Sequence, residues 1–360
     1  MKAIITSLIL LIAFSGYAQL KPGFDKQEYL EMLRISRKQF EPKDIKDNIP
    51  PPTEYKMIYR SPVGPLKNRW DLWVNNNKTA VISIMGSTNA QESWLENFYA
   101  AMVPANGQLQ LNDSTTFNYR LANNPKAAVH IGWLLGLADL SKTIVPQINK
   151  TYSENGIKDF IIIGHSQGAA IAYLLRSYLA DMQAKKLIPA DIVFKTYCSA
   201  PPKPGNIYYA YDYEFLTAGG WGIAITNAAD WVPQTPFTVQ TMSDFNTPNP
   251  FVDVKTVIKQ QQFFVRLYIN HVYNRLKKTP EKAQKTYEDY LGRLVYKFIK
   301  KSLPQFKEPA YLHEALFTRT GTPVILMPNE QYNKLYPFDA KNIFLNHDFG
   351  AYYKLASMQP

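Results

Sequence analysis

The sequence predicts an α/β fold, in which helices flank a mostly parallel central sheet and one helical region is inserted near the C-terminal end. Short β-branched runs alternate with segments of helical periodicity, which is typical of crossover connections between parallel strands. The run DFIIIGHS (159–166) has a wholly apolar centre, as expected for a strand that is buried on both faces. A strong helix pattern at 167–186 follows it directly.

The other elements follow from local patterns. Residues 25–38 predict an amphipathic helix that Asp25 caps, with an apolar side that begins at Tyr29. The polar, proline-rich stretch 41–56 indicates an extended connector. Further strands are expected at 69–76, 78–86, 191–200, 222–227 and 322–327, and further helices at 93–102 and 125–152.

Composition and the first residues narrow the classes of function. Residues 1–18 combine Lys2, an apolar run and small residues before a cleavage position at Ala18, which predicts a signal peptide and a secreted or periplasmic protein. No later apolar stretch is long enough to cross a bilayer. Cys198 is the only cysteine, which excludes an internal disulfide and a Cys/His metal cluster. The net charge of +11 favours anionic partners, but no nucleic-acid motif is present.

The motif GHSQG at 164–168 carries the chemistry. A G-x-S-x-G sequence between an apolar strand and a helix predicts a nucleophile elbow, in which Ser166 projects above the sheet edge from a strained turn. The N-terminus of the following helix offers N–H groups and a positive dipole end to a developing oxyanion. Ser166 is therefore the candidate nucleophile, and an ordinary glycine-rich βα turn is the alternative.

A serine hydroxyl needs a base, which in turn needs an acid to orient it. Enzymes with this elbow place the acid and then the base after the serine in the chain. Of the five histidines, His347 follows every expected strand and is the candidate base, with His313 as the fallback. Asp230 lies just after the expected strand 222–227 and is the candidate acid. A solvated loop aspartate is the alternative for Asp230.

Several motifs along the chain resemble those of the class 3 lipases, the family of the fungal triacylglycerol lipases, over residues 78–240 and 310–356. IIIGHSQGAAIAYLL resembles the family's GHSLGGALA elbow, KAAVHIGWLLGL its VHxGF segment, and YCSAPPKPGN its FGSPRVGN strand end. ITNAADWVPQTP and NHDFGAYYKL resemble the segments that carry the catalytic aspartate and histidine. The resemblance implies an α/β-hydrolase fold, with Asp230 and His347 as acid and base.

The resemblance also implies an oxyanion hole. IMGSTNAQESWLENF is similar to the family's FRGTxSxxDWLxNL segment, in which the residue after the glycine supplies the first N–H donor. Carried over, the backbone N–H groups of Ser87 and Gln167 would hold the oxyanion. The chain departs from the family where Met85 replaces the usual arginine, where one extra residue follows Ser87, and where Gln167 replaces a leucine. These departures concern the detail of the hole and not the type of reaction.

The expected function is a secreted serine ester hydrolase, a lipase that cleaves acylglycerol esters through Ser166, Asp230, His347 and an acyl-enzyme. It needs no metal or organic cofactor, because side chains and backbone dipoles supply the chemistry. A carboxylesterase, a phospholipase A1 or a carbohydrate-ester hydrolase with the same triad is the first alternative. An inactive hydrolase-fold binding protein is the second. Expected partners are a lipid or other ester and an anionic lipid surface, without nucleic acid and without an integral membrane span.

The expected organisation is a signal peptide at 1–18, a helix and connector at 19–60, a hydrolase domain at 61–253 and 304–360, and a helical insertion at 254–303. Pro280 is expected to break the insertion into a helical hairpin. We hypothesise that the hairpin caps the acyl pocket and presents basic residues to a lipid surface, and helices packed far from the site are the alternative. The basic residues are Lys255, Lys259, Arg266, Lys277, Lys278, Lys297, Lys300 and Lys301.

Overall fold

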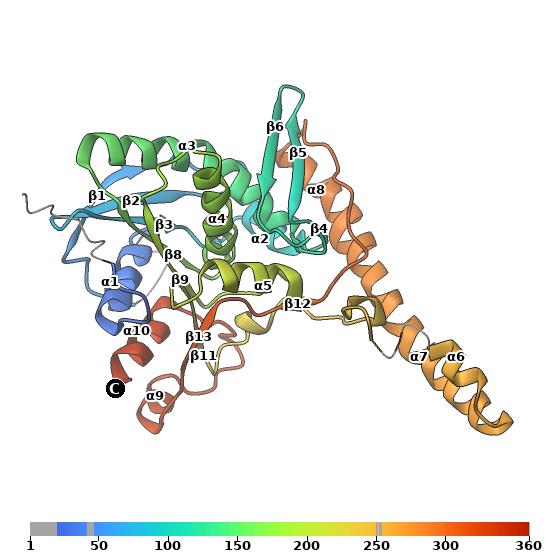
Figure 1. Ribbon diagram of the computed structural model, residues 1–360. Helices are drawn as coiled ribbons and strands as arrows, with labels where there is room; N and C mark the ends of the chain where they lie inside the picture. Colours follow the sequence, from blue (N-terminus) through green and yellow to red (C-terminus); the bar gives the residue numbers. More distant parts are fainter. Residues whose placement is uncertain (1–19, 42–46, 250, 252–253, 360) are drawn as a thin grey trace, which may run out of the picture.

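The structure is a computed structural model that describes residues 20–41, 47–249, 251 and 254–359. The predicted signal peptide (1–18) lies outside the described residues, and so does the 42–46 part of the connector. A central sheet organises the fold (Figure 1). Its seven strands, in spatial order, are β1 (Tyr55–Arg60), β2 (Trp70–Asn75), β3 (Thr79–Ile84), β8 (Asp159–His165), β9 (Val193–Ser199), β11 (Gly222–Asn227) and β13 (Thr322–Leu326).

The sheet is mixed and mostly parallel. Strands β3, β8, β9, β11 and β13 run parallel to one another, whereas β1 and β2 are added at one edge as antiparallel strands. In β8, the buried Ile161 and Ile163 face one hydrophobic core and the buried Phe160 and Ile162 face the other. The prediction of a parallel sheet with a central strand buried on both faces is therefore confirmed, as are all the predicted strands.

Helices cover both faces of this sheet. On one face lie α3 (Ile131–Asn155) and α4 (Gln167–Ala184), and on the other lie α1 (Lys26–Arg37) and α10 (Phe349–Met358) (Figure 1). Asp25 caps α1, since its Oδ1 accepts a hydrogen bond from the N–H of Glu28 at 2.9 Å. The remaining α-helices are α2 (Gln91–Phe98), α5 (Ile207–Leu216), α6 (Val254–Lys259), α7 (Phe263–Thr286), α8 (Val295–Ser302) and α9 (Glu330–Leu335).

A smaller sheet was not predicted. Its four strands, in spatial order, are β12 (Phe317–Thr318), β10 (Gly205–Asn206), β7 (Ala128–His130) and β4 (Met102–Pro104), and a separate hairpin joins β5 (Asn106–Asn112) to β6 (Thr115–Arg120). The helices predicted at 93–102 and 125–152 are correspondingly shorter than expected, because Met102 and His130 pair across β4 and β7. This pairing between distant segments overrides the local helical pattern.

The helical insertion contains no break at Pro280, so that prediction is wrong. Helix α7 passes through Pro280 and continues into a π-helix, η3 (Tyr287–Leu294), and then into α8. The turn of the hairpin lies instead at 260–262, between α6 and α7. Proline removes one N–H donor, and the carbonyl of Leu276 that loses its partner lies on an exposed part of the helix, where water can bind it. Among the described helices, none combines the length and apolar content that a bilayer crossing requires.

Candidate active site

The turn between β8 and α4 holds Ser166 in a strained conformation. Its φ of 59° and ψ of −127° are unfavourable for a residue that carries a Cβ. The flanking glycines allow a very close approach: a Cβ on Gly164 would lie 2.1 Å from the carbonyl oxygen of Gly168, and a Cβ on Gly168 would lie 2.5 Å from that of Ile84. The predicted sharp turn with close helix–strand packing is therefore confirmed, and it places the Ser166 side chain at the carboxyl edge of the sheet.

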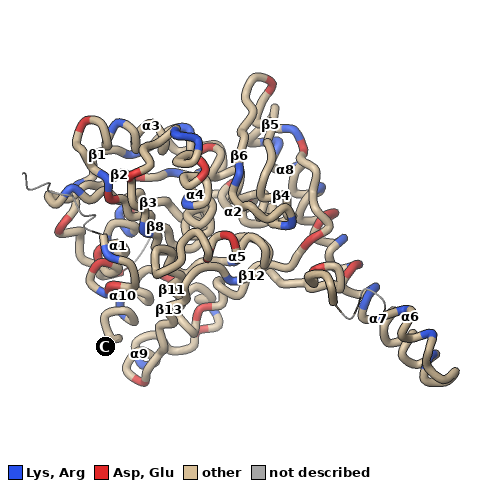
Figure 2. Tube along the Cα trace, viewed as in Figure 1, with Lys and Arg blue, Asp and Glu red and all other residues tan. Residues whose placement is uncertain are grey.

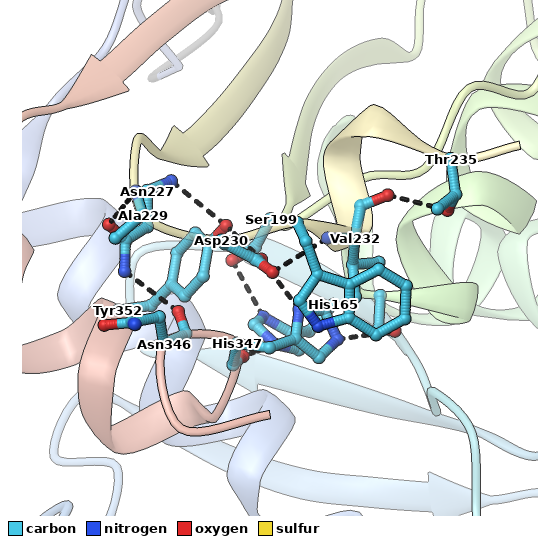
Figure 3. Close-up of polar contacts among 12 residues, drawn as sticks. His165, Ser199, Asn227, Ala229, Asp230, Val232, Thr235, Asn346, His347 and Tyr352 are labelled. Atoms are coloured by element: carbon cyan, nitrogen blue, oxygen red, sulfur yellow. Dashed lines mark hydrogen bonds and ion pairs between the residues drawn. The ribbon is translucent and has the colours of Figure 1, made fainter. Parts of the chain in front are cut away.

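The structure brings Ser166, Asp230 and His347 together. Nε2 of His347 lies 2.8 Å from Oγ of Ser166. Its Nδ1 lies 2.7 Å from Oδ2 of Asp230 (Figure 3). Ser166 follows β8, Asp230 lies in the loop after β11, and His347 immediately precedes α10. With Nδ1–H donating to the carboxylate, Nε2 is the acceptor for the serine hydroxyl proton. This arrangement can make the hydroxyl nucleophilic.

Two further donors hold the Asp230 carboxylate, which is only 2% exposed. The backbone N–H of Val232 donates to Oδ1 at 2.9 Å, and the Tyr352 hydroxyl donates to Oδ2 at 2.8 Å (Figure 3). The same hydroxyl accepts the N–H of Asn227 at 3.0 Å. Hydrogen bonds to an ionised carboxylate stabilise the charged form and compensate for its burial. Asp230 is thus held in a fixed orientation toward His347.

His165, the neighbour of the serine, holds the loop of His347 in place. Its Nε2 lies 2.8 Å from the carbonyl oxygen of His347, and its Nδ1 lies 3.0 Å from Oγ of Ser199 (Figure 3). Burial, together with the nearby His347, lowers the pKa of His165 well below its usual value. The neutral ring therefore donates Nε2–H to the carbonyl and accepts the Ser199 hydroxyl, which is also 2.7 Å from the Tyr29 hydroxyl. Sequence reasoning missed this role.

The two residues of the predicted oxyanion hole lie beside Ser166. Ser87 follows β3 and Gly86, and Gln167 is the first residue of α4. Within the described part of the chain, neither backbone N–H donates a hydrogen bond to another residue. Both residues line the same cavity as Ser166. The two N–H groups are therefore available to an anion, which leaves their proposed role open to test.

Asn97 on α2 joins the two segments, and sequence reasoning did not single it out. Its Nδ2 donates to Oγ of Ser87 at 2.9 Å, and its Oδ1 accepts Nε2–H of Gln167 at 3.0 Å. Its carbonyl oxygen lies 3.1 Å from Nε2 of His130. Burial lowers the pKa of His130 to about 3, so the ring is neutral and donates to this carbonyl. Gln167, which replaces the family's leucine, thereby becomes part of a polar network under the hole.

The fallback base, His313, lies away from Ser166. Its half-exposed ring has Nδ1 3.4 Å from Oε2 of Glu288, a residue of η3. It does not line the cavity that contains Ser166 and His347. Between the two histidines considered for the base, the structure therefore favours His347.

Ser166 opens into a cavity of about 920 Å³. Its walls come from α2, from the loops after β9 and β11, from the segment before α10, and from the insertion. The insertion contributes Tyr287 and Leu291 of η3, while α6 and α7 contribute no side chain to the walls. The large apolar side chains of the walls are Phe40, Trp94, Phe98, Trp133, Trp231, Phe237, Tyr287, Leu291, Phe344 and Phe349.

Comparisons with known proteins agree with the motifs. The family described as Lipase (class 3) matches residues 81–240, which confirms the predicted resemblance over the first of its two stretches; the match does not include residues 310–356. A curated relative, the secreted mono- and diacylglycerol lipase 1 of Fusarium solani, is 26% identical over 164 residues, which are 45% of this chain and 40% of that protein. The match therefore spans about two fifths of that relative's length.

Solved structures that resemble the fold include two fungal lipases. The Lip2 lipase of Yarrowia lipolytica has a TM-score of 0.45 and 17% identity, covering 61% of this chain and 78% of that one. The triacylglyceride lipase of Rhizomucor miehei has a TM-score of 0.43 and 17% identity, covering 60% of this chain and 77% of that one.

Proposed function

We propose that this chain, whose residues 81–240 match the class 3 lipase family, is a serine hydrolase that cleaves the carboxylic esters of lipids. The observation that carries the proposal is the hydrogen-bonded series from Ser166 through His347 to Asp230. A buried carboxylate, a ring oriented by it and a hydroxyl on a strained turn are the parts that acyl transfer requires. Secretion is part of the proposal, because the predicted signal peptide and the secreted relative support it.

The proposed reaction begins when Oγ of Ser166 attacks the ester carbonyl carbon and its proton moves to Nε2 of His347. Asp230 stabilises the resulting imidazolium. The tetrahedral intermediate collapses as the imidazolium protonates the leaving alcohol, and an acyl-enzyme remains. Water then repeats the sequence on the acyl-enzyme, with His347 as base, and releases the carboxylic acid.

The negative oxygen of each intermediate would be held by the N–H groups of Ser87 and Gln167. Because Oγ of Ser87 accepts a hydrogen bond from Asn97, its own O–H is free to donate a third bond. Removal of one such donor in other serine hydrolases costs about 3 kcal/mol of transition-state stabilisation. The Asn97 network fixes these donors before substrate arrives, which avoids reorganisation during the reaction.

The cavity favours lipid esters over small polar esters. A volume of about 920 Å³ with aromatic walls can enclose a long acyl chain, and the curated relative is a lipase of mono- and diacylglycerols. Acylglycerols are therefore the first substrates to test. The division into a hydrolase domain (61–253 and 304–360) and an insertion (254–303) also remains a proposal, in which η3 forms a wall of the pocket and α6–α7 extend away from it (Figure 1).

Covalent labelling tests the hydrolase proposal. A fluorophosphonate probe should label the wild-type protein at Ser166, as located by mass spectrometry, and should not label Ser166→Ala. Ser153→Ala, at an exposed serine of α3, is the matched control and should label like wild type. A folded wild-type protein that resists the probe would argue for the inactive binding protein. A series of p-nitrophenyl esters of rising chain length, with acylglycerol and phospholipid emulsions, then separates lipase, carboxylesterase and phospholipase.

A further inference from the structure

Helices α6 and α7 leave the body of the molecule as a projecting arm (Figure 1). We define the arm as residues 254–286. Its far end is the turn at 260–262, and its near end continues into η3, which lines the cavity. Ile258 and Gln284 are the only buried side chains of the arm. Most of this surface therefore has no partner within the described chain.

The far end of the arm exposes a cluster of large apolar side chains, which we call the tip. Phe264 is 81% exposed and Tyr268 is 71% exposed. A soluble monomer rarely displays such a cluster unless it serves an interaction. The six exposed apolar and aromatic residues of the tip are Val257, Phe263, Phe264, Val265, Leu267 and Tyr268.

The arm is also strongly basic. It carries eight lysines and arginines and a single acidic residue, Glu281 (Figure 2). The arm therefore contributes more than half of the net charge of +11 that the whole chain carries. Lys255, Lys259 and Arg266 lie within or next to the tip. The Arg266 guanidinium lies over the Phe263 ring, 5.6 Å from its centroid, so aromatic and cationic groups share one surface.

We propose that the arm docks on an anionic lipid bilayer, with the tip among the headgroups and acyl-chain ends and the basic residues against lipid phosphates. Interfacial helices combine apolar and cationic groups in this way. Long basic side chains can reach the phosphates while their methylene groups remain in contact with apolar surface. Charge decides against a second copy of the arm as the partner, because two such arms would repel each other.

Docking would also tether the cavity to the bilayer through α7. Helix α7 runs without interruption into η3, whose Tyr287 and Leu291 form part of the cavity wall. An arm fixed on a bilayer therefore tethers that wall to the lipid surface, at a distance limited by the length of α7. The inference rests on the proposed function only in its choice of a lipid as partner, because binding requires no ester cleavage.

Vesicle binding tests the inference without turnover. Ser166→Ala protein is mixed with vesicles of phosphatidylcholine alone or with one third phosphatidylglycerol, and bound protein is measured by sedimentation. One variant combines Phe263→Ser and Phe264→Ser, and another combines Lys255→Gln, Lys259→Gln and Arg266→Gln. Matched controls are Tyr211→Ser with Phe215→Ser on α5, both more than half exposed, and Lys56→Gln, Lys150→Gln and Lys334→Gln on the body. All variants are produced with the same N-terminal sequence, so that differences in vesicle binding come from the substituted residues.

The wild-type arm should prefer the anionic vesicles and release them at high salt. Each basic residue near an anionic surface raises the partition coefficient about fivefold, so the three glutamines should lower it by at least about tenfold, and the two serines by a similar factor. The body controls should bind unchanged. Equal binding by tip variants and controls would overturn the inference, and so would equal binding to both vesicle types.

Soluble-ester hydrolysis and light scattering complete the test. The two arm variants, with Ser166 intact, should hydrolyse a water-soluble ester at the wild-type rate, so loss of docking is distinguishable from loss of the proposed function. A dimer in solution that the Phe263→Ser, Phe264→Ser variant abolishes would identify a second copy as the partner and refute the lipid proposal.

Discussion

Glu96 allows a quantitative test of the packing beneath the proposed oxyanion hole. It lies on α2 next to Asn97 and is completely buried, and a Cβ on Gly136 of α3 would lie 2.5 Å from its Oε1. Burial raises the pKa of Glu96 well above its usual value, and the nearby amide of Asn68 opposes this rise only in part. The carboxyl group is therefore neutral in the folded protein under conditions in which it ionises in the unfolded chain.

The substitution Glu96→Gln keeps the shape of the side chain and removes its ionisation. A raised folded-state pKa means that the folded protein holds one proton more than the unfolded chain once the pH exceeds the ordinary value of 4.5. Wild-type stability then falls by up to about 1.4 kcal/mol per pH unit, until the folded-state pKa is reached. We expect the stability advantage of Glu96→Gln over wild type to grow as the pH rises above 4.5, at a rate of up to about 1.4 kcal/mol per pH unit.

The assay is the free energy of unfolding by urea, measured for both proteins across this pH range. Taking the difference between the two cancels the contributions of His130 and His165, which are the same in both. Glu92→Gln is the control on the same helix, because Glu92 is partly exposed and lies 3.7 Å from Lys67. A difference between Glu96→Gln and wild type that stays constant with pH would refute the reasoning, since it would mean that Glu96 ionises alike in both states.

Three further predictions concern side chains around the triad. Tyr352→Phe should lower the free energy of unfolding by about 2 kcal/mol and reduce kcat, because Asp230 loses a donor and a buried N–H loses its acceptor; wild-type values for both would contradict this. His165→Phe should reduce kcat for a soluble ester about tenfold with little change in KM, because the loop that carries His347 loses a hydrogen bond and shifts. His165→Gln keeps an N–H donor and should therefore restore part of the lost kcat. Equal kcat values for the two variants would show that His165 does not position His347. The lowered pKa values of His165 and His130 mean that protons bind these rings mainly in the unfolded chain, so stability should be fully present above about pH 6.5 and fall with acidification, by up to about 1.4 kcal/mol per pH unit for each ring. Thermal unfolding of Glu96→Gln, which lacks the opposing contribution of Glu96, checks this prediction. An unfolding temperature that stays constant down to about pH 5 would contradict it.

The fold and the positions of the triad could be predicted because both depend on order along the chain. In a parallel sheet the carboxyl ends of the strands meet at one edge, so residues that follow β8 and β11 must lie close together. Ser166 and Asp230 each follow such a strand, and His347 comes after all strands. Chain order and the ends of strands can be recognised in the sequence. Only three of the five histidines come late enough in the chain to follow both Ser166 and Asp230.

The supporting residues could not be predicted, because their roles depend on side-chain contacts between distant segments. Asn97 is an ordinary helical position until α2 is packed against the elbow, where its amide meets Ser87 and Gln167. The β4–β7 pairing likewise arises only in the assembled fold. At Pro280, local propensity favours a break, but a helix on an exposed arm tolerates the lost hydrogen bond.

The N-terminal helix illustrates how far the positioning of the base extends along the chain. The Tyr29 hydroxyl on α1 lies 2.7 Å from Oγ of Ser199, which bonds His165, whose ring bonds the carbonyl oxygen of His347. Helix α1 also packs against α10, the helix that His347 precedes. Because every polar group in this series is buried, displacement of α1 would leave several of them without partners at once. The position of His347 therefore depends on a segment more than 300 residues away in the chain, although α1 contributes no residue to the cavity.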